Sequence, residues 1–445
     1  GLHILERREE ITKVASADFG SPGPIVDFQA PLMHTLVPDN KKKKGKFEKL
    51  FLEGRPPVAL GVTSGGDVFG GTQVTFTDVL GDQQLSMFIS SVSQYRTMNF
   101  TWQNMERRLQ WALQGYSQTE FYYGQLEGVL YDPYLAQYID RDLATATRTV
   151  RGGTAFAIYP FNRYRRVELY GGFNYYQESY NDPAVEQAAN DYQQQQYGTQ
   201  IFNNGYMAPL GVAFVQETTI FREFGPLSGS TMRLSYEVAP KIAGSLSRQT
   251  FDADVRKYFR LGSTGLLALR ARGFKSFGDS PDFTYFGGNS ELRGYDYLSF
   301  IGNNVFFTNA ELRFPLIEAM ATPIGVLGGV RATLFAGMGG AYFNNQPFNF
   351  YTNKTTLETP VVGYNNITQQ PIYGPAVAID GMRLVDGNAS YGISLATFAL
   401  GFPLHFDWSW RTLLNRDWED VKFHLVGGSE EFRKPKFTMW IGYDW

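Results

Sequence analysis

The chain has 445 residues, enough for several soluble domains or for one large membrane barrel. Its formal net charge of −3 argues against a nucleic-acid partner, and the lack of cysteine excludes a disulfide scaffold and any cysteine-ligated metal. Aromatic residues make up 16% of the chain, yet no apolar run approaches the roughly 18 residues of a transmembrane helix. This combination favours a transmembrane β-barrel, in which only every second residue of a strand faces lipid.

Residues 1–55 do not alternate, and they predict an extended connector that continues from an upstream region. The segment contains four prolines and a lysine-rich run from Lys41 to Lys46. Such a run can bind anionic head groups, but a solvated linker is the commoner role.

From Val58 onward, segments of strictly alternating polarity follow one another, which is the pattern of strands with one apolar face. We therefore predict an all-β fold, with the barrel spanning residues 56–445. The predicted strands are 58–64, 72–79, 85–89, 98–102, 109–113, 148–158, 166–175, 210–221, 231–238, 251–261, 266–274, 305–315, 330–342, 391–402, 404–411 and 437–445.

Short and long connections alternate from residue 118, as they do in transmembrane barrels. The long polar stretches are 118–145, 177–207, 343–389 and 412–435. We expect them on one side of the membrane, opposite residue 55 and the last strand. Strand residues of the polar set predict a charged lumen, namely Arg233, Glu237, Asp252, Asp254, Arg256, Arg260, Arg270, Arg272, Glu311, Arg313, His405 and Asp407.

A loop punctuated by glycine precedes the strand at 305–315. It contains Gly287 and Gly288, followed by Leu292-Arg293-Gly294-Tyr295. The latter sequence resembles the arginine-glycine-aromatic motif of the BamA superfamily of outer-membrane insertases and secretion barrels. Phe286-Gly287-Gly288 before it and Glu311-Leu312-Arg313-Phe314-Pro315 after it are also similar to family sequence.

The resemblance covers about residues 57–445, and it implies a 16-stranded antiparallel barrel with a lumenal loop between strands 11 and 12. The family usually has Phe-x-Asp-x-Gly on the following strand, whereas this chain has Phe335-Ala336-Gly337-Met338-Gly339. Because the aspartate is missing, the resemblance implies that Glu311 holds Arg293, with Asp296 and Asp407 as alternatives.

The last nine residues resemble the C-terminal β-signal of outer-membrane proteins. Their apolar set, together with the glycine of the signal, is Phe437, Met439, Ile441, Gly442, Tyr443 and Trp445. The resemblance implies that this strand meets the first one in a weak lateral seam, and the glycines of the first strand predict weak pairing there. The seam residues are Val58, Leu60, Gly61, Val62 and Gly442.

The resemblance implies an integral protein of the bacterial outer membrane that inserts or translocates polypeptides through this seam. The implied partners are outer-membrane lipid and lipopolysaccharide, client polypeptides, and periplasmic or lipoprotein subunits. In that setting residues 1–55 are periplasmic. Two alternatives stay open: a passive channel or structural anchor of a larger complex, and an adhesin that uses loops 177–207 and 343–389.

No sequence pattern indicates catalysis or a cofactor. The four histidines, His3, His34, His405 and His424, lack metal-ligand spacing. Motifs of nucleophilic hydrolases, phosphate-binding loops and zinc proteases are absent from the sequence. We therefore expect neither a metal nor a cofactor, and no enzymatic activity.

Overall fold

The computed structural model describes residues 50–445 except 54–55, 57, 63–67, 93–94, 123–145, 199–203, 223–224, 263, 289–290, 298, 323–324, 366–369, 400–401 and 443–444. The predicted connector, including its lysine run, lies outside the described residues apart from its last few positions. There, β1 (Phe51–Leu52) pairs with the end of β3.

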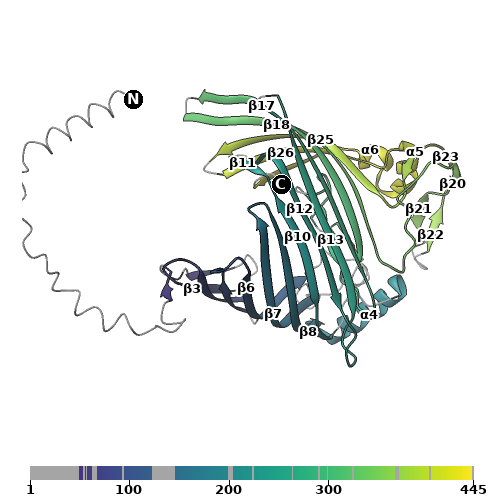
Figure 1. Cartoon of the computed structure of the whole chain (residues 1–445). Coiled ribbons are helices and arrows are strands. Elements are labelled where there is room, and N and C mark those ends of the chain that lie inside the picture. Colours follow the sequence, from purple (N-terminus) through teal and green to yellow (C-terminus); the bar gives the residue numbers. More distant parts are fainter. Residues whose placement is uncertain are drawn as a thin grey trace, which may run out of the picture. The chain divides into compact units, whose positions relative to one another are not determined.

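One large antiparallel sheet dominates the described residues, as the alternation predicted (Figure 1). Each main strand pairs with the next one along the chain. These strands are β2 (Val58–Val62), β3 (Val68–Thr77), β4 (Gln83–Val92), β5 (Tyr95–Asn104), β6 (Gln110–Tyr122), β7 (Ala146–Asn162), β8 (Arg165–Tyr180), β10 (Leu210–Glu217), β12 (Gly225–Ala239), β13 (Arg248–Leu261), β14 (Gly265–Phe277), β17 (Asn304–Thr322), β18 (Gly325–Tyr342), β25 (Asn388–Ala399), β26 (Phe402–Thr412) and β27 (Lys436–Ile441).

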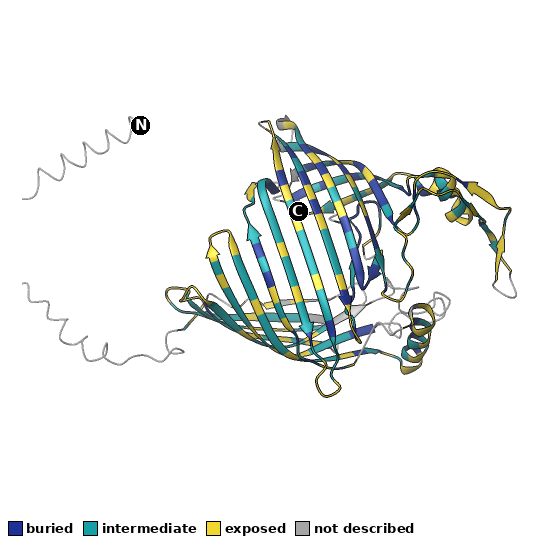
Figure 2. Cartoon of the chain, turned by 45° about the vertical axis from the view of Figure 1, so that its right-hand side comes forward, coloured by how far each residue is buried: buried dark blue, intermediate teal, exposed yellow. Residues whose placement is uncertain are grey.

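The two faces of this curved sheet differ in polarity, and exposure alternates along its strands (Figure 2). On β17, Glu311 and Arg313 are buried while Leu312 between them is exposed. We call the face that carries Glu311 the inner face and the face that carries Leu312 the outer face. Since the side-chain period of a strand is two, one register sorts charged and apolar residues onto opposite faces.

Ion pairs cross the inner face between neighbouring strands. Asp254 on β13 accepts from Arg270 on β14 at 2.9 Å, and Arg256 bonds the same carboxylate at 2.8 Å. Arg248 on β13 pairs with Glu237 on β12 at 3.0 Å. Pairing of this kind offsets the cost of holding charge away from bulk water.

Three long connections, after β8, β18 and β26, leave the sheet at one end because these strands run in the same direction. After β8 the chain forms α4 (Pro183–Tyr197), which begins where the Asp182 carboxylate accepts from Ala184 N–H at 2.7 Å, and then β9 (Gly205–Met207). After β26 come α5 (Arg416–Lys422), η4 (His424–Val426) and α6 (Gly428–Phe432). After β18 come short hairpin strands: β19 (Tyr351–Thr352), β20 (Thr356–Glu358), β21 (Val361–Tyr364), β22 (Pro371–Tyr373), β23 (Val377–Ile379) and β24 (Arg383–Leu384).

The sequence placed these three segments as long polar connections, and the structure shows short helices or hairpins within each of them. Short helices and hairpins satisfy their own backbone hydrogen bonds, so they form without the long alternation that marked the main strands. The polar stretch predicted from 118 also begins later, since β6 continues to Tyr122, and residues 123–145 lie outside the described ones.

The predicted strand 210–221 is divided in the structure. β10 ends at Glu217, and β11 (Ile220–Arg222) pairs separately with β12 across a register shift. Gly229 on β12 has a φ of 105°, and a Cβ there would come within 2.7 Å of the Thr218 carbonyl carbon. Glycine therefore permits a close approach at which the strand changes course.

Candidate functional site: the motif loop and the terminal strands

The motif loop connects β14 to β17 and returns over the inner face. A small hairpin of β15 (Thr284–Phe286) and β16 (Phe300–Gly302) forms its base. Gly287 and Gly294 have φ values of 135° and 87°, which disfavour any other residue. A Cβ at Gly294 would lie 2.9 Å from the Ser409 Cβ on β26. The glycine therefore lets the loop backbone lie directly against the inner face of the sheet at β26.

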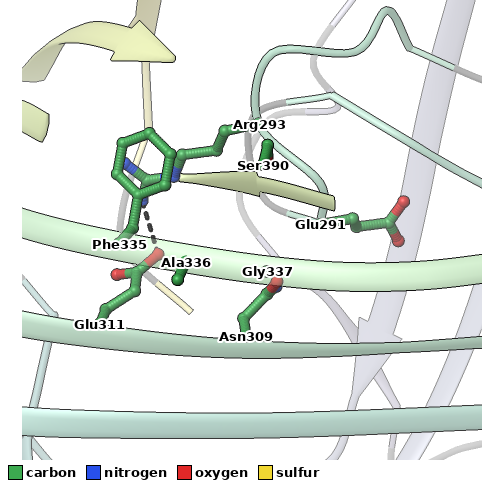
Figure 3. A pocket seen from close by; sticks show the side chains of 8 residues that line it. All are labelled: Glu291, Arg293, Asn309, Glu311, Phe335, Ala336, Gly337 and Ser390. Carbon is green, nitrogen blue, oxygen red and sulfur yellow. Dashed lines mark hydrogen bonds and ion pairs between the residues drawn. The ribbon is translucent and has the colours of Figure 1, made fainter. Parts of the chain in front are cut away.

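Arg293 is 5% exposed and contacts two carboxylates from different strands. Its Nη2 donates to Glu311 Oε1 on β17 at 2.7 Å, and its Nη1 donates to Asp407 Oδ2 on β26 at 3.3 Å (Figure 3 shows the first contact). The guanidinium carbon lies 4.6 Å from the centre of the Phe335 ring on β18. The planar fork of arginine suits this combination of two acceptors and an aromatic face.

Glu311 also binds a second arginine, so it is shared between the loop and the chain terminus. Arg313 Nη2 lies 2.7 Å from Glu311 Oε2, and both Arg313 terminal nitrogens donate to the Trp445 main-chain oxygen at 3.4 Å. Glu311 and Arg313 are 2% and 1% exposed. One carboxylate between two guanidinium groups leaves one net positive charge. The carboxylate of the nearby Asp407 helps to balance it.

The alternatives that the sequence raised are resolved by geometry. Asp407 shares Arg293 with Glu311, and its other contact is the Trp440 indole N–H at 2.9 Å. Asp296 instead pairs with Lys436 at the start of β27.

Gly337, which stands where the resemblance implied an acid, lies directly under the loop. A Cβ at this position would come within 3.2 Å of Leu292 Cδ1. Leu292 itself is fully buried in an aromatic cluster with Phe286 and Phe307. The Asn309 side chain on β17 lies closer still to this position, so that side chain and the loop together leave little room for an aspartate. Asp407 supplies the second carboxylate from another strand.

Tyr295 fixes the other side of the motif. Its ring packs edge-on against Phe300, with centroids 5.0 Å apart, and its hydroxyl donates to the Ala389 carbonyl at 3.3 Å. Together the four motif residues contact β17, β18, β25 and β26.

The remaining cavity between loop and wall is small, about 10 Å³, and is lined by Glu291, Arg293 and Glu311 among others (Figure 3). That volume is close to the minimum for one water molecule, so the motif is a packed contact and not a substrate pocket. Burial raises the pKa of the Glu291 carboxyl above its usual range, although it accepts from Gly287 N–H at 3.0 Å.

The first and last main strands each pair on one side only within the described residues. Among the described residues, no ladder joins β2 to β27. β2 pairs only with β3 and β27 only with β26. Val58 and Leu60 are 70% and 78% exposed, and Phe437, Met439 and Ile441 of the last strand are likewise exposed. Gly61 and Val62 pair with Phe69 and Val68, and the side chains from 61 to 69 lie outside the described residues.

The end of the last strand departs from the predicted alternation, which is a correction to the expected strand 437–445. β27 stops at Ile441, and Trp445 is buried on the inner face, whereas Tyr443 lies outside the described residues. The Trp445 ring packs with Tyr258 of β13 and Leu266 and Ala268 of β14. Burial of a large aromatic ring in an apolar patch outweighs continuation of an edge strand that has no second partner.

Sequence reasoning missed the aromatic partners of this site. Trp440 stacks on His405 with centroids 3.9 Å apart, and His405 Nε2 lies 2.9 Å from the Gly442 carbonyl. Alternation along the last strand does place Trp440 on the inner face, since its neighbour Met439 belongs to the apolar set. This alternation is the only sequence feature that indicates the position of Trp440. Nothing local indicates that Trp445 would contact strands so distant in the chain.

The described residues contain no cluster of three side chains suited to hold a metal ion. In the same part of the chain, no helix combines the length and apolar character needed to span a membrane.

The large antiparallel sheet, with a polar inner face and an apolar outer face, defines the class of outer-membrane β-barrel proteins. A family model described as the Omp85 superfamily domain matches residues 71–430, and the chain belongs to this superfamily. The resemblance to the BamA superfamily is thereby confirmed, as is an integral outer-membrane location. At the family level the role is insertion or translocation of proteins at the outer membrane.

One solved structure supports the fold, and two others show a lower similarity. BamA from Haemophilus ducreyi lacking POTRA domains 1–3 is 12% identical with a TM-score of 0.50, and the match covers 86% of this chain and 74% of that one. CdiB from Acinetobacter baumannii is 13% identical with a TM-score of 0.40, covering 83% of this chain and 57% of that one. CdiB from Escherichia coli is 12% identical with a TM-score of 0.41, covering 88% and 66%. None of the curated proteins compared matches the chain.

The contact between loop and wall predicts a stability change. Glu311→Gln removes the charge that Arg293 and Arg313 share, so we expect the free energy of unfolding to fall by about 1–3 kcal/mol, the range for a charge-assisted hydrogen bond. Urea unfolding, followed by heat-modifiable migration on gels, measures the change. Glu430→Gln, at an exposed position on α6, is the matched control. Equal unfolding midpoints for Glu311→Gln and the parent chain would show that the contact does not stabilise the barrel.

Proposed function

We propose that this protein inserts or translocates polypeptides at the outer membrane through a lateral seam between β2 and β27. In this proposal the sixteen main strands from β2 to β27 close into a barrel around the motif loop. The observation that carries the proposal is that both edges of the sheet are unpaired within the described residues.

An unpaired edge is a template for a further strand. Exposed N–H and C=O groups of an edge can pair with an incoming segment of another chain, a process known as β-augmentation. β2 has 5 residues and β27 has 6, whereas β17 has 19 and β18 has 18. A closed seam between such short strands contains few hydrogen bonds, each with a net worth of about 0.5–1.5 kcal/mol, and opening it is correspondingly easy.

The inward course of the chain after Ile441 supports the same role. β27 ends at Ile441, and Trp445 lies against β13 and β14. In this proposal, part of the β2 edge has no counterpart on β27. A client strand with the outward apolar residues of a membrane barrel would satisfy both the backbone groups and the lipid-facing positions there.

The motif loop would support this seam from inside. Arg293 binds Asp407 of β26, the strand that holds β27, and Glu311 of β17 on the remaining wall. Opening at β27 can therefore proceed while β26 stays fixed to the body of the barrel.

A disulfide across the seam tests the proposal. The chain has no cysteine, so Leu60→Cys with Ile441→Cys introduces one defined pair. A bond forms only when the two Cα atoms come within about 7 Å, which requires the seam to close. We expect oxidation to stop insertion of a client barrel into liposomes that contain the protein, and reduction to restore it.

Thr75→Cys with Ser86→Cys is the matched control, because these residues are direct partners in the β3–β4 ladder. That disulfide should leave insertion unchanged. If the oxidised seam variant inserts clients at the rate of the reduced one, the seam is not the route, and a channel or anchoring role takes its place.

The topology generates a separate prediction. The segments after β8, β18 and β26 leave the same end of the sheet, so we expect all three at the cell surface. Protease added to intact cells should cut within 343–387 and leave the turn after Leu261 intact, as read by fragment masses. Cleavage at that turn in intact cells would reverse the orientation.

A further inference from the structure

The outer face of the sheet contains a groove that the seam and the motif loop do not use. Its volume is about 540 Å³ and its lining is mainly apolar. Small residues form its floor, where Ala310 of β17 pairs with Ala336 of β18 and Thr308 lies one row away. Tyr391 of β25, stacked on Trp410 at 6.0 Å between centroids, forms one wall.

The groove is long enough to hold one acyl chain of a lipid. Its lining residues follow two hydrogen-bonded rows from β13 across β14, β17, β18 and β25 to β26. Five strand spacings of about 4.8 Å give roughly 24 Å. One leaflet is about half of the roughly 30 Å hydrocarbon core, so an acyl chain fits within this length.

A lysine stands at the β13 end of the groove. Lys257 is exposed on the outer face between Val255 and Phe259, which are both apolar and exposed. Within the described ranges no ion pair involves this ammonium group. Its Nζ lies 5.6 Å from the centre of the Phe259 ring. A cation among lipid-facing apolar residues is costly unless an anion lies near it.

We propose that this groove binds one anionic glycerophospholipid, with its phosphate at Lys257 and one acyl chain along Ala310 and Ala336 toward Leu414. Lys257 is close to the β13 terminus at Leu261, which by the proposed topology is the periplasmic end. The occupant is therefore a phospholipid of the inner leaflet. The long stem of lysine lets the ammonium reach the head-group level while its methylenes stay on apolar surface.

The groove would be distinct from the general lipid contact of a barrel because its floor is recessed. Bulky residues on the same face, such as Leu312 and Leu334, are exposed and stand out from the sheet. An acyl chain lying over alanines between bulky neighbours makes more van der Waals contacts than one on a convex surface. This gives a preferred position for one lipid molecule.

Native mass spectrometry of the purified full chain in detergent tests the proposal, with palmitoyl-oleoyl phosphatidylglycerol as the probe and the matching phosphatidylcholine as competitor. We expect one phosphatidylglycerol to remain bound under activation that removes phosphatidylcholine. Lys257→Gln should reduce this preference about five-fold, the equivalent of about 1 kcal/mol for one basic residue near an anionic surface. Ala310→Leu with Ala336→Leu should abolish retention of both lipids at this position.

Matched controls separate the groove from the rest of the outer face. Ala253→Leu on β13 and Lys275→Gln on β14 alter residues outside the groove and should retain the lipid as the parent chain does. Heat-modifiable migration verifies that every variant is folded. This experiment is independent of client insertion, so its failure does not affect the proposed seam.

Three results would overturn the proposal. The filled groove could retain phosphatidylglycerol as well as the parent chain does. Lys257→Gln could leave the preference over phosphatidylcholine unchanged. The bound mass could match lipid A or a polypeptide instead of the added phospholipid.

Discussion

A single buried carboxylate, Glu311, connects the parts of this barrel that are remote in sequence. It binds Arg293 from the loop and Arg313 from its own strand, and Arg313 in turn contacts Trp445 at the end of the chain. A charge in this position can be stable only if every partner is in place, because an unpaired buried ion costs several kcal/mol. The motif loop, the wall at β17 and the last residue therefore depend on one another.

The same contacts hold the motif loop against the long strands of the sheet. Ladder hydrogen bonds along β17, β18 and β25 form a long, continuous wall, and the loop binds that wall through Arg293, Leu292 and Tyr295. β27 is joined to the wall through β26, whose Asp407 contacts both Arg293 and Trp440. The long ladders and the loop contacts therefore belong to the same group of strands, while among the described residues β2 and β27 each pair on one side alone.

The sequence predicts the parts of this structure that depend on local periodicity. Alternation on 305–315 assigns Glu311 and Leu312 to opposite faces, and the structure has the same assignment. Helix α4 and the hairpins after β18 escaped prediction because short elements carry little periodic signal. The inward turn of Trp445 also escaped prediction, since it depends on an apolar patch made by Tyr258 and Leu266, far away in the chain. The sequence named Asp407 as an alternative partner of Arg293, but it did not indicate that Asp407 and Glu311 bind the arginine together.

Gly337 shows how a departure from a family pattern can be compensated elsewhere. A side chain on β18 at this position would meet Leu292, and the structure supplies the missing negative charge from β26. The change alters which strand the arginine holds, since a carboxylate on β18 would attach the loop to the middle of the wall. Asp407 attaches it to the strand that is paired with β27. With Asp407 as the second acceptor, the contact of the loop lies two strands closer to β27 than an acid at position 337 would place it.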